Sequence, residues 1–97
     1  MLPGVFSSPV PLPSATFTVS IVSHLQAELC AQLIEDLARH AAASVAKIIL
    51  TENVPRSLPS LGKLPFPVEV IRNECPKGFG ENHNRAFRRS TTPFFAV

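Results

Sequence analysis

A glycine-containing stretch near the C-terminus holds the residues best suited to binding a ligand. It reads Gly78-Phe79-Gly80-Glu81-Asn82-His83-Asn84-Arg85-Ala86-Phe87 and comes soon after the apolar run at residues 66–71. A strand followed by a glycine turn and a helix start often holds an anion in α/β proteins, because free N–H groups and the helix dipole favour negative charge there. Many such turns bind nothing, so the meaning of this one depends on the elements around it.

The first half of the chain alternates between strand and helix patterns. Residues 17–23 and 45–51 are rich in β-branched and apolar side chains, which favours strands that are buried on both faces. Between them, apolar residues recur at helical spacing, and Ser23 with Gln26 matches a capping box that would start a helix just after Ser23. The expected apolar stripe of this helix comprises Leu29, Leu33, Ile34, Leu37, Ala38 and Ala41.

The second half continues the alternation after a proline-rich connection. Prolines at 55, 59, 65 and 67 predict a loop over residues 52–67. A third strand is expected at residues 68–72, a helix at 82–90, and the beginning of a fourth strand at 94–97. Ala86, Phe79 and Phe87 are expected to face the core. This order predicts an α/β fold with an open, parallel, Rossmann-like sheet.

Length and composition limit the class of protein. The chain has 97 residues, of which 45% are hydrophobic and 16% charged, as expected for one small globular domain. A net charge of +2 does not indicate nucleic-acid binding, so no nucleic-acid partner is expected. Cys30 and Cys75 are far apart, so we expect two reduced thiols and no metal site built on them.

The N-terminal residues differ from the rest of the chain. Residues 1–16 are apolar but contain four prolines and no basic residue, unlike a secretory signal. We expect a flexible proline-rich leader there and a domain at residues 17–97. No run approaches the ~20 apolar residues of a membrane span, so no transmembrane segment is expected. The expected location is the cytoplasm, with a peripheral position at the inner face of the membrane as a further possibility.

Three polar stretches follow the three predicted strands. They are Ser23-His24, Thr51-Glu52-Asn53 and residues 73–84. The carboxyl ends of parallel strands meet at one edge of a sheet, and ligands of open α/β sheets bind outside that edge. We therefore expect these stretches to gather into one site.

Taken in order, the three stretches resemble the N-terminal portion of family-two glycosyltransferases. Residues 18–24 resemble the opening strand of that family, and residues 48–53 resemble its second strand, which ends in Asp-Asn. Residues 73–87 resemble its motif of Asn, then Gly-Phe-Gly, then Asn-x-Ala/Gly, especially in the rhamnosyltransferase-like branch. The resemblance covers residues 17–97. It implies the nucleotide-binding half of an A-type glycosyltransferase fold, truncated at the fourth strand, from an inverting enzyme.

The resemblance also implies roles for individual residues. Ser23 and His24 would line the nucleobase side of the pocket. Glu52 stands where the family usually has an Asp that holds the base or ribose, and a carboxylate there accepts hydrogen bonds. Gly78 and Gly80 would let the backbone approach the nucleotide, and Asn84, preceded by His83, matches the Asn at the helix start. The implied nucleotide-sugar-binding residues are Ser23, His24, Glu52, Asn53, Gly78, Gly80, His83 and Asn84.

The catalytic groups of the family have no counterpart in this sequence. The family carries an Asp-containing metal motif after the fourth strand and a later Asp or Glu as general base, whereas Asp36, on the first helix, is the single aspartate here. We therefore expect no catalytic residue, no metal site and no bound cofactor in this chain alone, which would be inactive by itself. The complete enzyme would use Mg or Mn and a nucleotide-diphosphate sugar, with a glycan or lipid-linked acceptor.

Two other functions fit the same residues. One is a non-catalytic module that binds a nucleotide, and the other is a generic α/β interaction domain without a ligand. Under the second, His24 and Glu52 would be solvated strand-end residues, and the asparagines at 82 and 84 would be helix caps. The arginines at 85, 88 and 89 also suit a solvated helix face.

Overall fold

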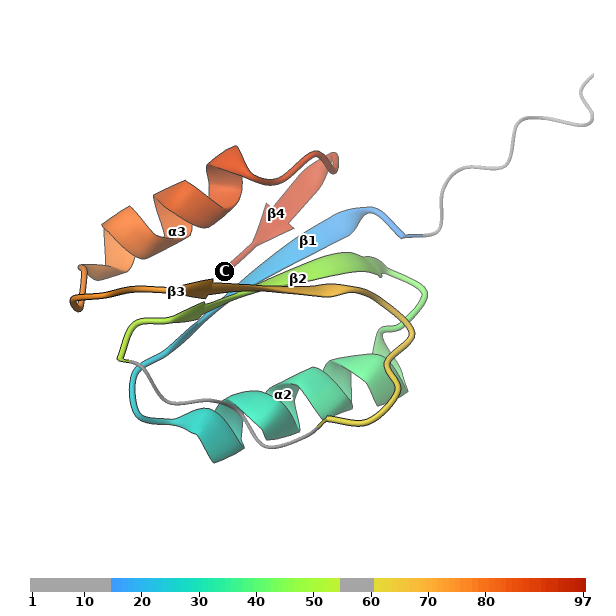
Figure 1. Cartoon of the computed structure of the whole chain (residues 1–97). Coiled ribbons are helices and arrows are strands. Elements are labelled where there is room, and N and C mark those ends of the chain that lie inside the picture. The colour runs from blue at the N-terminus through green and yellow to red at the C-terminus, as the bar shows by residue number, and fades with distance from the viewer. Residues whose placement is uncertain (1–14, 55–60) are drawn as a thin grey trace, which may run out of the picture.

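The computed structural model describes residues 15–54 and 61–97 and has an α/β fold (Figure 1). Four parallel strands form one sheet in the order β3-β2-β1-β4, which confirms the predicted parallel α/β arrangement. Residues 1–14 of the leader predicted at 1–16, and the prolines at 55 and 59, lie outside the described residues. Thr16 is hydrogen-bonded to Ser44 and Phe94 and thus belongs to the sheet. The elements are β1 (Phe17–Ser23), α2 (Ala27–His40), β2 (Val45–Glu52), β3 (Val68–Arg72), α3 (Phe79–Arg88) and β4 (Phe94–Ala96).

The two helices cover opposite faces of the sheet (Figure 1). The chain passes from β1 through α2 to β2 and β3 on one side, and then returns through α3 to β4 on the other side of β1. Right-handed crossovers that run in opposite directions along a sheet place their helices on opposite faces. The direction in which successive strands are added to the sheet therefore reverses, and the point of reversal lies between β1 and β4. Neither described helix has the length and apolar character that a membrane crossing requires.

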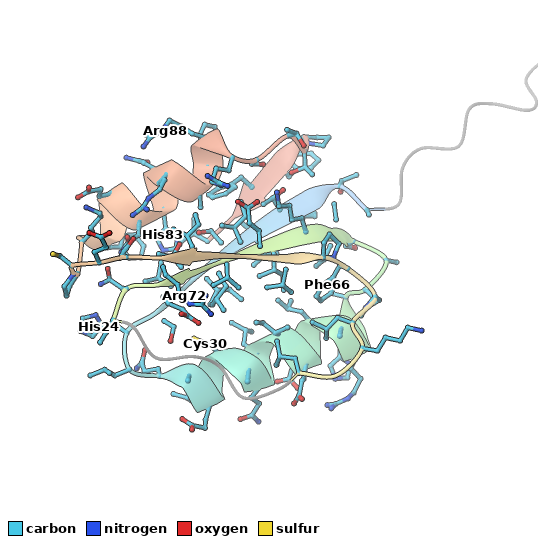
Figure 2. The ribbon with its side chains drawn as sticks, viewed as in Figure 1. His24, Cys30, Phe66, Arg72, His83 and Arg88 are labelled. Carbon is cyan, nitrogen blue, oxygen red and sulfur yellow. The ribbon has the colours of Figure 1, made fainter. Side chains whose placement is uncertain are left out.

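The hydrophobic core lies between the sheet and α2. Ile48, Ile49 and Leu50 of β2 are fully buried, because this strand is covered on both faces. Side chains from α2 and from the loop before β3 complete the core on one face (Figure 2). The buried members of this cluster are Ile21, Cys30, Ile34, Val45, Ile48, Leu50 and Phe66.

The start of α2 differs from the prediction. Ser23 still belongs to β1, where its carbonyl accepts the Asn53 N–H (2.8 Å), and Gln26, not Ser23, stands at the N-cap of α2. Leu25 has a φ of 62°, which is unfavourable for a residue with a Cβ and interrupts the helical conformation. The helix begins only at Ala27, and Gln26 at the N-cap makes no side-chain capping bond. The predicted capping box was therefore wrong.

The buried face of α2 is also rotated from the predicted stripe. Ala27, Cys30, Ala31 and Ile34 are buried against the sheet, with Leu37, Ala38 and Ala41 partly buried beside them. Leu29 is 64% exposed and Leu33 is 45% exposed, so these two were wrongly placed in the core. The two leucines therefore lie beside the buried face of the helix and not within it.

Helix α3 begins at Phe79 rather than at residue 82, with Gly78 at its N-cap. Its buried side chains are Asn82, His83 and Ala86, so a mainly polar face of the helix packs against the sheet. The prediction of core positions for Phe79 and Phe87 was wrong, since they are 73% and 59% exposed. Phe79 instead meets the His83 ring edge-on, and Phe87 meets Phe95 in the same way.

A cluster of three charges ties β2, β3 and the end of α3 together. Glu69 of β3 accepts from Lys47 of β2 (Nζ–Oε1 2.6 Å) and from Arg89, just after α3. The hydrogen bond from Lys47 is the main reason that the pKa of Glu69 lies below its ordinary value of 4.5, and Arg89 adds to the effect. This cluster attaches α3 to the edge of the sheet.

Replacing Glu69 with glutamine should reduce stability in a pH-dependent way. At neutral pH, Glu69→Gln is expected to lower the free energy of unfolding by about 1 kcal/mol, because Lys47 and Arg89 lose their negatively charged partner. The pKa of Glu69 is lower in the folded chain than its ordinary value of 4.5. The stabilisation that Glu69 provides is therefore fully present above pH 4.5, and it is lost as the pH falls through the pKa of the folded chain. Urea unfolding at neutral pH and at about pH 3 measures the difference.

The matched control is Glu35→Gln, at an exposed position on α2. It should leave the free energy of unfolding within about 0.5 kcal/mol of the unmodified chain at both pH values. A deficit of Glu69→Gln that persists unchanged at acidic pH would contradict an origin in the ion cluster.

Candidate functional site

The three polar stretches lie at one edge of the sheet, as predicted. The last paired residues of β1, β2 and β3 are Ser23, Glu52 and Arg72, which stand side by side in register. Asn53 and Asn73 follow β2 and β3 directly, and the Asn73 N–H donates to the Glu52 carbonyl (3.0 Å). At the carboxyl edge, β2 and β3 therefore end in the same way, because each has a charged residue followed by an asparagine.

Three buried asparagine side chains connect this edge to α3. Asn73 Nδ2 donates to Asn53 Oδ1 (2.8 Å) and to Asn82 Oδ1 (2.9 Å). All three side chains are almost completely buried. Because each amide finds partners inside the group, these polar side chains can be buried without leaving unpaired donors. We call Asn53, Asn73 and Asn82 the amide network.

The amide network also holds the loop between β3 and α3. Asn53 Oδ1 accepts from the Lys77 backbone N–H (2.7 Å), and Asn53 Nδ2 donates to the Lys77 carbonyl (3.1 Å). Asn82 Nδ2 reaches the same carbonyl (3.3 Å). The side chain of Asn53 thus pairs with Lys77 in the way that a neighbouring strand would, and this pairing fixes the path of the chain into Gly78.

Two arginines are oriented at this edge by buried acceptors. Arg72 Nε donates to Glu52 Oε1 (2.7 Å), and Arg85 Nη2 donates to Asn73 Oδ1 (2.6 Å). The Glu52 side chain is only 2% exposed, whereas that of Arg72 is 63% exposed and keeps other donors free for a ligand. Both arginines line a cavity of about 290 Å³ together with Lys77 and Cys75.

Figure 2 shows His83 between α3 and the sheet. Its Nδ1 lies 2.7 Å from Ser20 Oγ of β1, and its ring is covered by Phe79. Burial lowers the pKa of His83 below its ordinary value of 6.5, because a charged imidazole would lose its hydration there. A neutral ring can exchange one hydrogen bond with Ser20 in either tautomer. His83 therefore joins α3 to β1.

The other residues predicted for the site differ in their accessibility. His24 is exposed, and its Nδ1 accepts from Asn53 Nδ2 (3.1 Å), while Ser23 is buried. Gly78 and Gly80 are exposed, and a Cβ added to either would meet no atom within 4 Å. Asn84 is exposed within α3, so the prediction that it stands at the helix start was wrong.

Sequence reasoning gave no binding role to several residues of the site, namely Arg72, Asn73, Lys77, Ser20 and Asn82. Glu52 orients Arg72, and Asn73 orients Arg85 and pairs with Asn82. Lys77 carries the anchored loop, and Ser20 pairs with His83. One signal could have found the first two: the pairs Glu52-Asn53 and Arg72-Asn73 both end a predicted strand, with opposite charges on neighbouring strands. The Ser20–His83 pair spans 63 residues and has no local signal.

A larger cavity of about 640 Å³ lies beside β1. At the carboxyl edge it is bordered by polar residues of the amide network, and further along β1 it is bordered by Leu33 and Leu37 of α2 and by Phe79 of α3. Within the described ranges, no group of three or more His, Cys, Asp or Glu side chains is placed so that it could hold a metal ion.

Comparison with other proteins adds no assignment. No protein-family model matches this chain, and a search of curated proteins gives no match.

Removing the Asn73 side chain should destabilise the whole edge. Asn73→Ala removes the donor to Asn53 and Asn82 and the acceptor of Arg85, and it leaves the buried Asn82 oxygen without this donor, so we expect a loss of about 2 kcal/mol in the free energy of unfolding. Asn84→Ala, at an exposed position of α3, should cost less than about 0.5 kcal/mol. Denaturant unfolding of both variants makes the comparison, and equal losses would contradict the described role of the amide network.

Burial of neutral His83 should make stability depend on pH. In the unfolded chain His83 takes up a proton near its ordinary pKa of 6.5, whereas in the folded chain it does so only at lower pH. The free energy of unfolding should therefore fall as the pH drops below 6.5. His83→Gln should remove this part of the pH dependence. His40→Gln, at the exposed end of α2, should retain it. Thermal unfolding between about pH 7 and pH 5 tests the difference, and an unchanged slope in His83→Gln would refute it.

Proposed function

We propose that this chain is the nucleotide-sugar-binding part of an inverting glycosyltransferase with an A-type, Rossmann-like fold. In this proposal the carboxyl edge binds a nucleotide-diphosphate sugar, which is transferred to an acceptor hydroxyl by groups that the described residues do not supply. Three features support it: the order of the strands, the meeting of the polar stretches, and the open surface at the two glycines.

The order of the strands supports a ligand site at the carboxyl edge. The order β3-β2-β1-β4 is that of the first four strands in doubly wound dinucleotide-binding sheets. In such sheets ligands bind outside the carboxyl ends, where the chain reverses direction. Here the order of the strands reverses between β1 and β4. His24 follows β1 at this point and contacts Asn53 of the amide network.

The single observation that carries the proposal is the position of Asn53. Its one side chain contacts His24 after β1, Asn73 after β3 and Lys77 before α3. The three stretches that resemble the family in sequence therefore meet at one amide. Asn53 thereby joins polar groups from all three stretches at the carboxyl edge, which is where ligands of open parallel sheets bind.

The accessible groups at this edge suit a nucleoside diphosphate. His24 offers an exposed ring for the nucleobase side, and the free donors of Arg72 and Arg85 suit phosphate oxygens. Gly78 and Gly80 leave room for a close approach to the backbone. In this arrangement Glu52 acts through Arg72, which it orients, rather than by accepting from the ribose directly.

The proposal divides the reaction between this chain and other groups. The described residues bind and orient the nucleotide, and the expected Mg or Mn and the general base would come from outside them. This chain alone is therefore expected to bind the donor without transferring the sugar. A glycan or lipid-linked acceptor agrees with a cytoplasmic location at the inner face of the membrane, which is part of the same proposal.

The test is titration calorimetry with UDP, dTDP and GDP, each with and without manganese. At least one nucleotide should bind, and Gly78→Ala should weaken that binding by at least about tenfold, because a Cβ would enter the space that the nucleotide needs. Since the added Cβ meets no protein atom, the free energy of unfolding of Gly78→Ala should stay within about 0.5 kcal/mol of the unmodified chain.

Two histidines provide a matched control. His24→Ala should weaken nucleotide binding, whereas His40→Ala, at the opposite end of α2, should not. If none of the three nucleotides gives heat or thermal stabilisation, the proposal fails, and a generic interaction domain becomes the better interpretation. Binding that is unaffected by Gly78→Ala and His24→Ala would locate the nucleotide elsewhere.

A further inference from the structure

We propose that α3 is a releasable element of the fold, which mild acid detaches from the sheet while β1, β2, β3 and α2 keep their arrangement. The helix leaves by breaking its polar contacts, and the carboxyl edge then loses the hydrogen bond between Asn82 and Asn73. The release is a conformational device that the chain carries with or without a bound nucleotide, so it does not depend on the proposed function.

The first observation is the polar character of the contact between α3 and the sheet. Asn82 and His83 are polar, and Ala86 is the one apolar side chain among the buried residues of α3. The buried side chains of α2 are all apolar, and the hydrophobic core lies on its side of the sheet. Because segments that bury little apolar surface open at a lower free energy than the core, we expect α3 to open before α2.

The second observation is a buried hydroxyl group on the face of the sheet that α3 covers. Ile48 and Leu50 point into the core cluster beside α2, so Thr51, the next residue of β2, points to the opposite face (Figure 1). Thr51 is fully buried, and among the described residues its Oγ1 has no hydrogen-bond partner. A buried hydroxyl without a partner costs free energy, which is recovered when water reaches it. Release of α3 therefore relieves an unfavourable feature of the closed form.

Thr18 of β1 is a satisfied counterpart of Thr51 on the same face. Val19 packs against the core cluster on the α2 side, so Thr18, its neighbour in the strand, points to the α3 side. Thr18 is also fully buried, but its Oγ1 lies 2.7 Å from Oγ1 of Thr92, in the segment that follows α3. The two hydroxyl groups therefore act in opposite directions, since that of Thr18 helps to hold the segment in place and that of Thr51 opposes burial.

The third observation is the place of His83 in this contact. Its ring is buried between α3 and β1, where Nδ1 lies 2.7 Å from Ser20 Oγ (Figure 2). A protonated ring loses its hydration in the closed form and regains it when the helix leaves the sheet, which is why burial lowers the pKa of His83 below 6.5. The closed form binds fewer protons than the released form, so it loses stability as the pH drops below 6.5.

The charged groups around His83 do not compensate its protonation. β1 carries no charged residue, and the cations of the other segments packed there are Lys47, Lys77, Arg85, Arg88 and Arg89. The carboxylates are Glu69, which pairs with Lys47 and Arg89, and Glu81, which pairs with Lys77. Among the described residues, no carboxylate contacts the imidazole, and Lys77 lines the same cavity as the ring. A proton on His83 therefore adds to an excess of positive charge.

Amide hydrogen exchange of the full chain, followed by NMR without a nucleotide, tests the release. At pH 7 the amides of residues 83–88 in α3 should be at least about tenfold less protected than those of residues 48–50 in β2, after correction for intrinsic exchange rates. Between pH 7 and pH 5 the protection of the α3 amides should fall by at least about fivefold, because the released helix takes up a proton at His83. The β2 amides should remain better protected at both pH values.

Two valine substitutions form a matched pair, since each removes a hydroxyl group from a fully buried threonine on the same face of the sheet. Thr51→Val removes a group without a partner among the described residues and should raise the protection of the α3 amides by about fivefold. Thr18→Val removes the partner of Thr92 and should lower that protection by about fivefold.

Histidine variants identify the group that responds to acid. His83→Gln should abolish the change in α3 protection between pH 7 and pH 5. His24→Gln, which removes the imidazole that contacts Asn53, should retain it. The proposal is overturned if the α3 and β2 amides are equally protected, if the fall in protection persists in His83→Gln, or if Thr51→Val lowers α3 protection as Thr18→Val does.

Discussion

The buried pairing of Asn73 with Asn53 and Asn82 is the interaction on which the carboxyl edge depends. A buried amide without partners costs several kcal/mol, so each of these side chains requires the others in place. The pairing brings together the end of β2, the end of β3 and the first turn of α3. Hydrogen bonds among buried amides can hold such polar elements in one arrangement, because each group would lose its partner if the others moved.

The same network determines where the neighbouring segments lie. Because Asn53 pairs with both backbone groups of Lys77, the loop is held flat against the strand ends, and α3 begins at Phe79, immediately after it. Asn82, His83 and Ala86 of this helix face the sheet, where Asn82 pairs with Asn73 and His83 pairs with Ser20. Phe79 lies outside this buried face and is exposed.

The strands could be predicted well from the sequence, whereas the helix starts could not. The bounds of β1 and β3 were predicted to the residue, and β2 is one residue longer than expected, because β-branched apolar runs are local signals. The start of α2 depends on the left-handed Leu25, and that of α3 on partners in other strands. Asn82 looks like a helix cap in sequence but lies inside the helix, since its side chain is committed to Asn73 and Lys77.

The site was predictable in position but not in the roles of its members. Parallel strand ends must meet, so the meeting of His24, Glu52 and Asn73 follows from topology alone. Which of them faces a ligand depends on tertiary partners: Glu52 is buried because Arg72, in register on the next strand, neutralises it. Asn53 is buried among its partners Asn73 and Lys77, whereas His24, which it also contacts, stays exposed. The topology thus determines which residues meet at the edge, and the side-chain pairing determines which of them a ligand could reach.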